Sequence, residues 1–383
     1  MAKGHIAEKN GVYYCVIAFR DPLTKKDRRK WIRSGNSKRE AEKLLVKLLY
    51  EMDISGGYIE PPKMTVAEYL MYWLDKYVKK NTRENTFDSY EKFIRVHIIP
   101  GMGNIPLSKL LPVHIEDLLD KKMESGRADG KPGGLSARSV HYIYSIIHEA
   151  LEYAVEKEML PRNPAKKVKP PRRQKKKVGT WTVEEIRKFL AAAQGTRFYV
   201  LYTLALTTGM RRGELLALCW RDIEFRDEIG IVRVKHTLSK QRTLEPVKTE
   251  ESERPVIITH EMVSLLKQHR LKQREERLAA GPAYQDHDLV FCTKIGTPLN
   301  AENVVKRHFY PLIKKAGVSR ITFHGLRHCS ATHALEGDAS LKIVQKRLGH
   351  TTIKTTGDIY THPEVKAQIK VAAVINEVIF GGK

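Results

Sequence analysis

Residues 324–328 of the chain read His-Gly-Leu-Arg-His, residues 348–350 read Leu-Gly-His, and Tyr360 follows ten positions later. A second guanidinium lies far upstream, at Arg211 in the segment Thr-Gly-Met-Arg-Arg-Gly-Glu-Leu of residues 208–215. Two arginines can hold the non-bridging oxygens of one phosphodiester by charge-assisted hydrogen bonds while a tyrosine oxygen attacks the phosphorus in line. The pattern therefore predicts a protein–DNA phosphotyrosine as a reaction product.

The overall composition fits a large polyanionic partner. The chain has 383 residues and a formal net charge of +24, more basic than folding requires. Single cores stop growing at roughly 250–300 residues, so a chain of this length is expected to form two or three domains. The hydrophobic content of 42% is enough to build their cores. We expect a globular protein that binds nucleic acid.

The cysteines and the apolar segments bear on the compartment. The four cysteines, Cys15, Cys219, Cys292 and Cys329, are widely separated, which argues against a disulfide framework and against a paired-cysteine zinc site. The first residues lack the apolar core of a signal peptide, and no stretch reaches the roughly 18–20 apolar residues that span a bilayer. The sequence predicts a cytoplasmic, nucleoid-associated protein.

The first predicted domain covers residues 1–57. Residues 11–19 and 28–33 are rich in β-branched and aromatic side chains and are predicted strands, and the capping box that starts at Ser37 opens a helix. This sheet can lie in a DNA major groove, or its aromatic residues can fill a small core while its cations are solvated. The side chains concerned are Tyr13, Tyr14, Arg20, Lys25, Lys26, Arg28, Arg29, Lys30, Trp31 and Arg33.

The second predicted domain covers residues 64–165 and is helical. A capping box at Thr65 opens its first helix, and further helices are predicted near 85–97, 113–125 and 136–157 from apolar residues at helical spacing. Residues 166–180 then combine two adjacent prolines with dense positive charge, which indicates an extended linker. The linker either lies along a DNA backbone or serves only as a solvated spacer.

The third predicted domain covers residues 181–362 and is mostly helical with a small antiparallel sheet. Its predicted strands are 230–237 and 254–258, and its predicted helices are 182–194, 197–208, 260–279, 300–316, 324–336 and 340–348. Residues 363–383 form a predicted tail helix, which either docks on a neighbouring protomer or packs on its own domain. The predicted fold class is thus mainly α with small antiparallel sheets.

These motifs, in this order, resemble those of the tyrosine recombinases, the integrase family of site-specific DNA recombinases. The resemblance covers about residues 180–362, while residues 65–165 resemble the core-binding domain of the family. The N-terminal sheet resembles the arm-binding domains of phage and conjugative-transposon integrases. No single short motif decides the match, but several occur in the family order with suitable spacing.

The resemblance implies roles for six residues. Arg211 and Arg327 would bind the scissile phosphate together with His324, which shares one helix face with Arg327. Arg211 can also be read as a surface ion-pair partner of Glu214. Histidines 324, 328 and 333 can be read as metal ligands, but no nearby carboxylate or cysteine completes a set, so no metal is predicted.

The remaining three residues would act on the oxygen that attacks the phosphorus and on the 5′-oxygen that leaves it. Tyr360 would be the nucleophile, and His350 would hydrogen-bond the phosphate or the attacking oxygen. His350 can otherwise be read as a helix-end cap and Tyr360 as a packing residue. Lys248 corresponds to the lysine that protonates the leaving 5′-oxygen, with Lys235 and Lys240 as rivals in the same region.

This chemistry implies no ATP, no metal and no other cofactor, because the 3′-phosphotyrosine conserves the energy of the cleaved bond. Recombination needs four such attacks and a Holliday junction, and hence a homotetramer on double-stranded DNA with core and arm sites. An excisionase or a DNA-bending protein is a further expected partner. Two alternatives remain open from the sequence: a type IB topoisomerase-like relaxing enzyme, and a DNA-binding regulator without catalysis.

Overall fold

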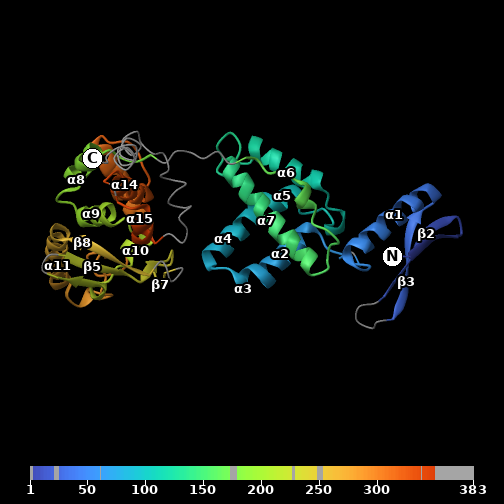
Figure 1. Ribbon diagram of the computed structural model, residues 1–383, viewed down its shortest axis with the longest axis horizontal. Coiled ribbons are helices and arrows are strands. Elements are labelled where there is room, and N and C mark those ends of the chain that lie inside the picture. The colour runs from blue at the N-terminus through green and yellow to red at the C-terminus, as the bar shows by residue number, and fades with distance from the viewer. Residues whose placement is uncertain are drawn as a thin grey trace, which may run out of the picture. The chain divides into compact units, whose positions relative to one another are not determined.

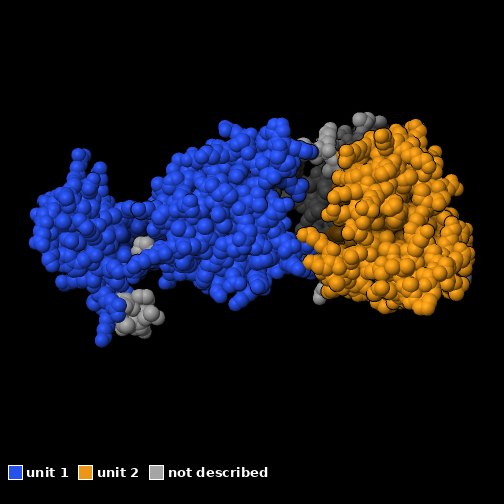
Figure 2. Space-filling view, turned by 180° about the vertical axis from the view of Figure 1, so that it is seen from behind, with its two compact units in different colours: residues 1–175 blue, residues 176–383 orange. Residues whose placement is uncertain are grey.

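The computed structural model describes residues 3–20, 26–60, 62–172, 179–226, 229–247, 253–337 and 339–349. The chain divides into two compact units, residues 1–175 and residues 176–383, which Figure 2 colours separately. The boundary falls inside the predicted basic linker of residues 166–180. The further division of the first unit into a sheet domain and a helical domain stays a prediction.

The first unit begins with a three-stranded antiparallel sheet in the order β1-β2-β3, followed by a helix (Figure 1). The elements are β1 (Lys3–Lys9), β2 (Val12–Arg20), β3 (Asp27–Gly35) and α1 (Lys38–Ser55). The two predicted strands and the helix are confirmed, and Ser37 caps the helix while Gly56 ends it at a φ of 73°. Strand β1 was not predicted, because it has few β-branched residues and its pairing with β2 creates it.

The rest of the first unit is helical, as predicted. Its elements are α2 (Val66–Trp73), η1 (Leu74–Val78), α3 (Lys79–Asn81), α4 (Glu84–Phe93), η2 (Ile94–Ile98), α5 (Ile99–Met102), η3 (Leu107–Lys109), α6 (Pro112–Ser125), α7 (Ala137–Glu156) and η4 (Pro164–Lys167). The predicted capping box is confirmed, because Thr65 and Glu68 each bond the backbone N–H of the other. Trp73 is fully buried with apolar residues of α7, including Ile143 and Ile147.

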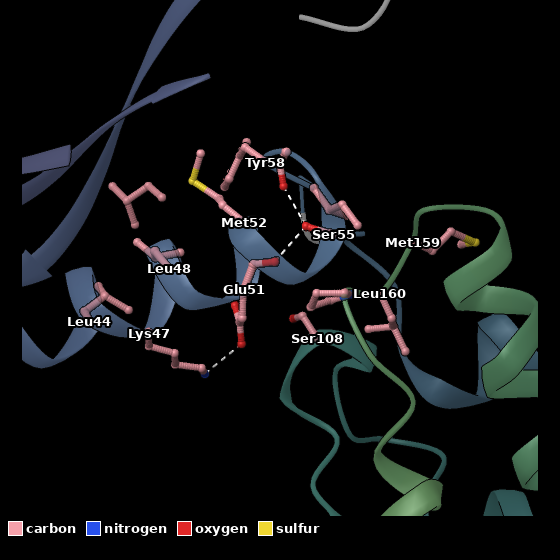
Figure 3. A pocket seen from close by; sticks show the side chains of 14 residues that line it. Leu44, Lys47, Leu48, Glu51, Met52, Ser55, Tyr58, Ser108, Met159 and Leu160 are labelled. Carbon is pink, nitrogen blue, oxygen red and sulfur yellow. Dashed lines mark hydrogen bonds and ion pairs between the residues drawn. The ribbon is translucent and has the colours of Figure 1, made fainter. Parts of the chain in front are cut away.

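A mostly apolar cavity of about 260 Å³ lies between α1 and the segments around Ser108 and Leu160 in the first unit (Figure 3). Its polar groups bond locally: Ser55 donates to the carbonyl of Glu51, and Lys47 lies 3.9 Å from the Glu51 carboxylate. Of the predicted catalytic residues that the structure describes, Arg211, His324 and Arg327, none lines this cavity. The cavity therefore lies apart from the described residues of the predicted site.

The second unit combines helices with a three-stranded antiparallel sheet in the order β4-β5-β8 and a two-stranded hairpin of β6 and β7. Its first half holds α8 (Val183–Ala193), α9 (Tyr199–Thr208), α10 (Arg212–Leu216), η5 (Trp220–Asp222), β4 (Ile223–Phe225), β5 (Ile229–Val234), β6 (His236–Leu238), β7 (Leu244–Pro246) and β8 (Arg254–Thr259). Its second half holds α11 (His260–Ala280), η7 (Gly281–Ala283), α12 (Ala301–Asn303), η8 (Val304–Phe309), α13 (Tyr310–Ala316), α14 (Phe323–Glu336) and α15 (Leu341–Leu348).

The fold class of mainly α structure with small antiparallel sheets is confirmed. One strand boundary differs: the predicted strand 230–237 is two strands in different sheets, because β5 pairs with β8 while β6 pairs with β7. Helices α9 and α14 pack against each other beside the core residues Tyr202 and Phe309. No helix within the described residues is long and apolar enough to cross a membrane. The predicted tail helix lies outside the described residues.

Candidate active site

The first predicted site residue, Arg211, stands at a turn between two helices. Helix α9 ends at Gly209, whose φ of 65° is left-handed, and Arg211 is the residue before α10. A side chain at Gly209 would also place its Cβ 2.6 Å from Leu348 Cδ2, so this close approach to α15 favours glycine. The turn therefore brings Arg211 beside the end of α15.

Helix α14 carries two further predicted residues on one face. Thr322 caps the helix by accepting a hydrogen bond from the N–H of Gly325, and His324 lies in its first turn. Arg327 is only 2% exposed and donates from Nη1 to the carbonyl of Gly209 and from Nη2 to that of Leu348, each at 2.8 Å. The helix thus presents one buried cation and one imidazole near a positive helix end, which favours an anion.

The two arginines meet at the C-terminal end of α15. Arg211 Nη2 donates to the carbonyl of Gly349 at 2.8 Å, next to the Leu348 carbonyl that Arg327 holds. The elements α9, α10, α14 and α15 lie in one part of the second unit (Figure 1). The side chain of Arg211 keeps 39% of its surface exposed, so it can still reach a ligand. Residues 211 and 327, distant in the sequence, belong to one site.

The buried carboxylate of Glu214 supports this cluster, a role that was not predicted from the sequence. Its buried carboxylate accepts from Arg211 Nη1 at 2.8 Å and from Arg254 Nη2 at 3.0 Å, and it also accepts from the Arg211 backbone N–H. Burial alone would raise the pKa of Glu214, but the two guanidinium groups outweigh burial and hold it below its ordinary value. The ion pair expected as an alternative role of Arg211 therefore exists, with a buried partner and within the site.

A signal for Glu214 was present in the sequence, while none was present for Arg254. Glutamate three residues after the N-cap residue is the capping-box position, and here it bonds the N–H of the N-cap residue Arg211. Arg254 lies forty residues from its partner Glu214 in the sequence, with no local pattern that joins them. Only the fold brings the two together.

The surroundings of His324 favour its neutral form. Part of the residue is exposed to solvent, but the protein atoms around the imidazole ring exclude enough water to lower its pKa. His328, whose ring centre is 4.8 Å away, and the guanidinium groups of Arg327 and Arg211 act in the same direction and bring the pKa to about 4. At neutral pH His324 is thus an uncharged imidazole with one N–H to donate.

The other three predicted site residues, Lys248, His350 and Tyr360, lie outside the described residues. Of the rival lysines, Lys235 stands 3.4 Å from the buried Asp222 carboxylate, and Lys240 lies between β6 and β7. Among the described residues no group of three or more histidine, cysteine, aspartate or glutamate side chains could hold a metal ion.

Known proteins resemble this chain over nearly its whole length. The Phage integrase family profile matches residues 180–367, and the profile "Phage integrase, N-terminal SAM-like domain" matches residues 65–123. A tyrosine recombinase XerC-like protein of Caldanaerobacter subterraneus subsp. tengcongensis is 31% identical, and the match covers 99% of this chain and 100% of that protein. The chain belongs to the tyrosine recombinases. It is therefore an enzyme, a site-specific DNA recombinase.

Solved structures agree with this recombinase fold. The Tn1549 transposon integrase in complex with a circular intermediate DNA has a TM-score of 0.67 at 18% identity, over 82% of this chain and 99% of that chain. A lambda integrase tetramer bound to a Holliday junction has a TM-score of 0.56 at 21% identity, over 93% of this chain and 95% of that chain. The recombinase thus shares its fold with integrases across both units.

Proposed function

We propose that this recombinase is the integrase of a mobile element, which cuts and rejoins DNA through a 3′-phosphotyrosine and a Holliday junction. The observation that carries the proposal is the meeting of Arg211 and Arg327 at the end of α15, with His324 near enough for both charges to lower its pKa. Arg211 and Arg254 share the Glu214 carboxylate there while Arg327 bonds the Leu348 carbonyl, and such a gathering of guanidinium groups suits a phosphodiester. The match to the Phage integrase family supports the origin in a mobile element.

In the proposed reaction, the Tyr360 phenol gives its proton to a neighbouring base or to water and its Oη bonds to the scissile phosphorus, while the bond from phosphorus to the 5′-oxygen breaks. Arg211 and Arg327 neutralise charge on the equatorial oxygens, and the neutral His324 donates its N–H to one of them. His350, which follows Gly349 directly in the sequence, hydrogen-bonds the phosphate or the attacking oxygen. Lys248 gives a proton to the leaving 5′-oxygen, whose alkoxide is otherwise a poor leaving group.

The second half of the reaction reverses the first on another strand. The 5′-hydroxyl of the partner strand attacks the phosphotyrosine, a new phosphodiester forms, and Tyr360 is released as a phenol. Because each broken bond is replaced by an equivalent bond, the exchange needs no ATP. Arg211 and Arg327 neutralise the phosphate charge, which is the task of a metal ion in other phosphoryl transfers. Four strands must be cut and joined, so the active assembly is a homotetramer, which the solved lambda integrase tetramer supports.

The basic first unit and linker would supply the hold on DNA. The SAM-like region of residues 65–123 and the linker of residues 166–180 would bind the core site, and the N-terminal sheet would bind a distal arm site. On β3, Trp31 is 54% exposed next to the exposed residues Arg29 and Arg33, which suits a sheet face that meets nucleic acid. The tail of residues 363–383 would dock on a neighbouring protomer, and the recombinase would act at the nucleoid with an excisionase or a DNA-bending protein.

A nicked DNA substrate that traps the covalent adduct tests the proposal. The protein is incubated in EDTA with a core site nicked near the cleavage point, and the adduct is followed on a denaturing gel. We expect a covalent adduct with the wild type and none with Tyr360→Phe. Cleavage that persists in Tyr360→Phe would refute the assignment of the nucleophile. Exchange products from paired sites support the recombinase, whereas relaxation without exchange would support the topoisomerase-like alternative.

A further inference from the structure

Arg254 joins three segments of the second unit that are far apart in the sequence. It is the first residue of β8 and is 6% exposed. Its Nη2 and Nη1 atoms lie 3.0 and 3.3 Å from the two carboxylate oxygens of Glu214, and its Nε donates to the carbonyl of Arg347 at 2.7 Å. One planar side chain thus ties β8 to the start of α10 and to the end of α15.

The end of α15 receives an arginine at each of three consecutive carbonyls. The carbonyls of residues 347, 348 and 349 accept from Arg254, Arg327 and Arg211 respectively. The last carbonyls of a helix lack partners within the helix and carry its partial negative charge, so guanidinium groups suit them. The two arginines proposed to bind phosphate, Arg211 and Arg327, therefore bond the same helix end as Arg254.

The close fit around Arg254 needs the glycine at position 349. This residue has a φ of 66°, and a Cβ built on it would lie 2.9 Å from Arg254 Nη1 and 3.1 Å from Arg254 Cδ. The guanidinium of Arg254 thus packs directly against the backbone that leads into His350. A shift of Arg254 would move both the Glu214 carboxylate and this turn.

We propose that Arg254 is a positioning residue for strand cleavage, acting through Glu214 and the end of α15 to hold Arg211 in the orientation that grips the scissile phosphate. The inference rests on the proposed function and deepens it. The Glu214 carboxylate bonds both Arg211 and Arg254, so the orientation of the Arg211 side chain depends on Arg254. Arg254 also stands six positions after Lys248 in the sequence and anchors the strand that follows that lysine.

The chemistry of the contacts requires arginine at this position. Lysine would preserve the positive charge next to Glu214, but its single ammonium cannot bond both carboxylate oxygens and the Arg347 carbonyl in one plane. Arg254→Lys therefore removes the geometry and keeps the charge. A matched control is Arg233→Lys on the neighbouring β5, where Arg233 pairs with Glu224 at 3.2 Å at the surface.

The test measures the rate of covalent adduct formation in single turnover at saturating core-site DNA, with DNA affinity and the melting temperature measured in parallel. Arg254→Lys is expected to slow adduct formation at least about tenfold while the Kd for DNA changes less than about twofold, because misplacing a phosphate ligand costs the transition state more than binding. Arg233→Lys is expected to behave as the wild type. An unchanged rate in Arg254→Lys would overturn the proposal.

A double variant distinguishes positioning through Arg211 from an independent effect. If Arg254 acts through Arg211, the combined loss in Arg211→Lys with Arg254→Lys is smaller than the product of the two single losses. Losses that multiply would overturn the proposal. Should the melting curve show that Arg254→Lys does not fold, Arg254→Gln is measured instead, with the same expected loss and the same refuting outcome. A wild type that forms neither the covalent adduct nor exchange products would instead refute the proposed function itself.

Discussion

Replacing Glu214 by glutamine removes one negative charge from beneath two guanidinium groups and keeps the shape of the side chain. The carboxylate is 2% exposed and Arg254 is 6% exposed, so the change removes a full negative charge and one of two acceptor oxygens from beside a buried cation. Breaking a buried ion pair by removing one partner costs about 3–5 kcal/mol. Because glutamine keeps one acceptor oxygen, we expect a loss of about 3 kcal/mol in the free energy of unfolding of the second unit.

This loss can be measured by calorimetry on the full chain, in the transition that belongs to the second unit. For a unit of this size ~3 kcal/mol corresponds to a melting temperature lower by about 6–12 °C. The matched control is Glu224→Gln, because Glu224 pairs with Arg226 and Arg233 at the exposed surface, and we expect no change in its melting temperature. A shift in Glu214→Gln no larger than that of the control would refute the reasoning about the buried carboxylate.

The same variant has a pH signature with a definite sign. The pKa of Glu214 is lower in the folded protein than its ordinary value of 4.5, so the unfolded chain binds more protons in the window below about pH 4.5. The contribution of Glu214 to stability is therefore complete above that window and is lost as the pH falls through the folded pKa. In Glu214→Gln this part of the acid dependence should disappear, and an unchanged acid dependence would contradict the assignment.

Two further predictions concern the neighbouring residues. The pKa of His324, followed by NMR in the free protein, is expected near 4. It is expected to rise in His328→Gln, because the change removes an imidazole whose positive charge disfavours protonation of His324. A pKa near 6.5 in the wild type would contradict this account of the site. Gly209→Ala places a side chain on left-handed backbone and brings its Cβ to 2.6 Å from Leu348 Cδ2. We therefore expect the free energy of unfolding, measured in urea, to fall by about 1–3 kcal/mol, together with slower adduct formation. Stability and rate equal to the wild type would show that this turn tolerates a side chain.

Much of the architecture is readable from local patterns. The capping-box patterns at Ser37 and Thr65 mark helix starts that the structure confirms, and the apolar spacing of residues 136–157 predicts the helix α7. Strand β1 and the break between β5 and β6 escaped prediction. Both depend on which strand pairs with which, and such pairing is not encoded in the residues of one segment.

The sequence by itself determined the family of the chain and predicted its reaction, because residue types and their order can be read without the fold. Two arginines, histidines, a lysine and a tyrosine follow one another in the recombinase order. Only the tertiary structure decided how Arg211 and Arg327 are held. It placed them on neighbouring carbonyls of α15 and supplied Glu214 and Arg254 as the buried support. The physical reason is that a buried charge must find its partners in space, and those of Arg327 include the Gly209 carbonyl, 118 positions away along the chain.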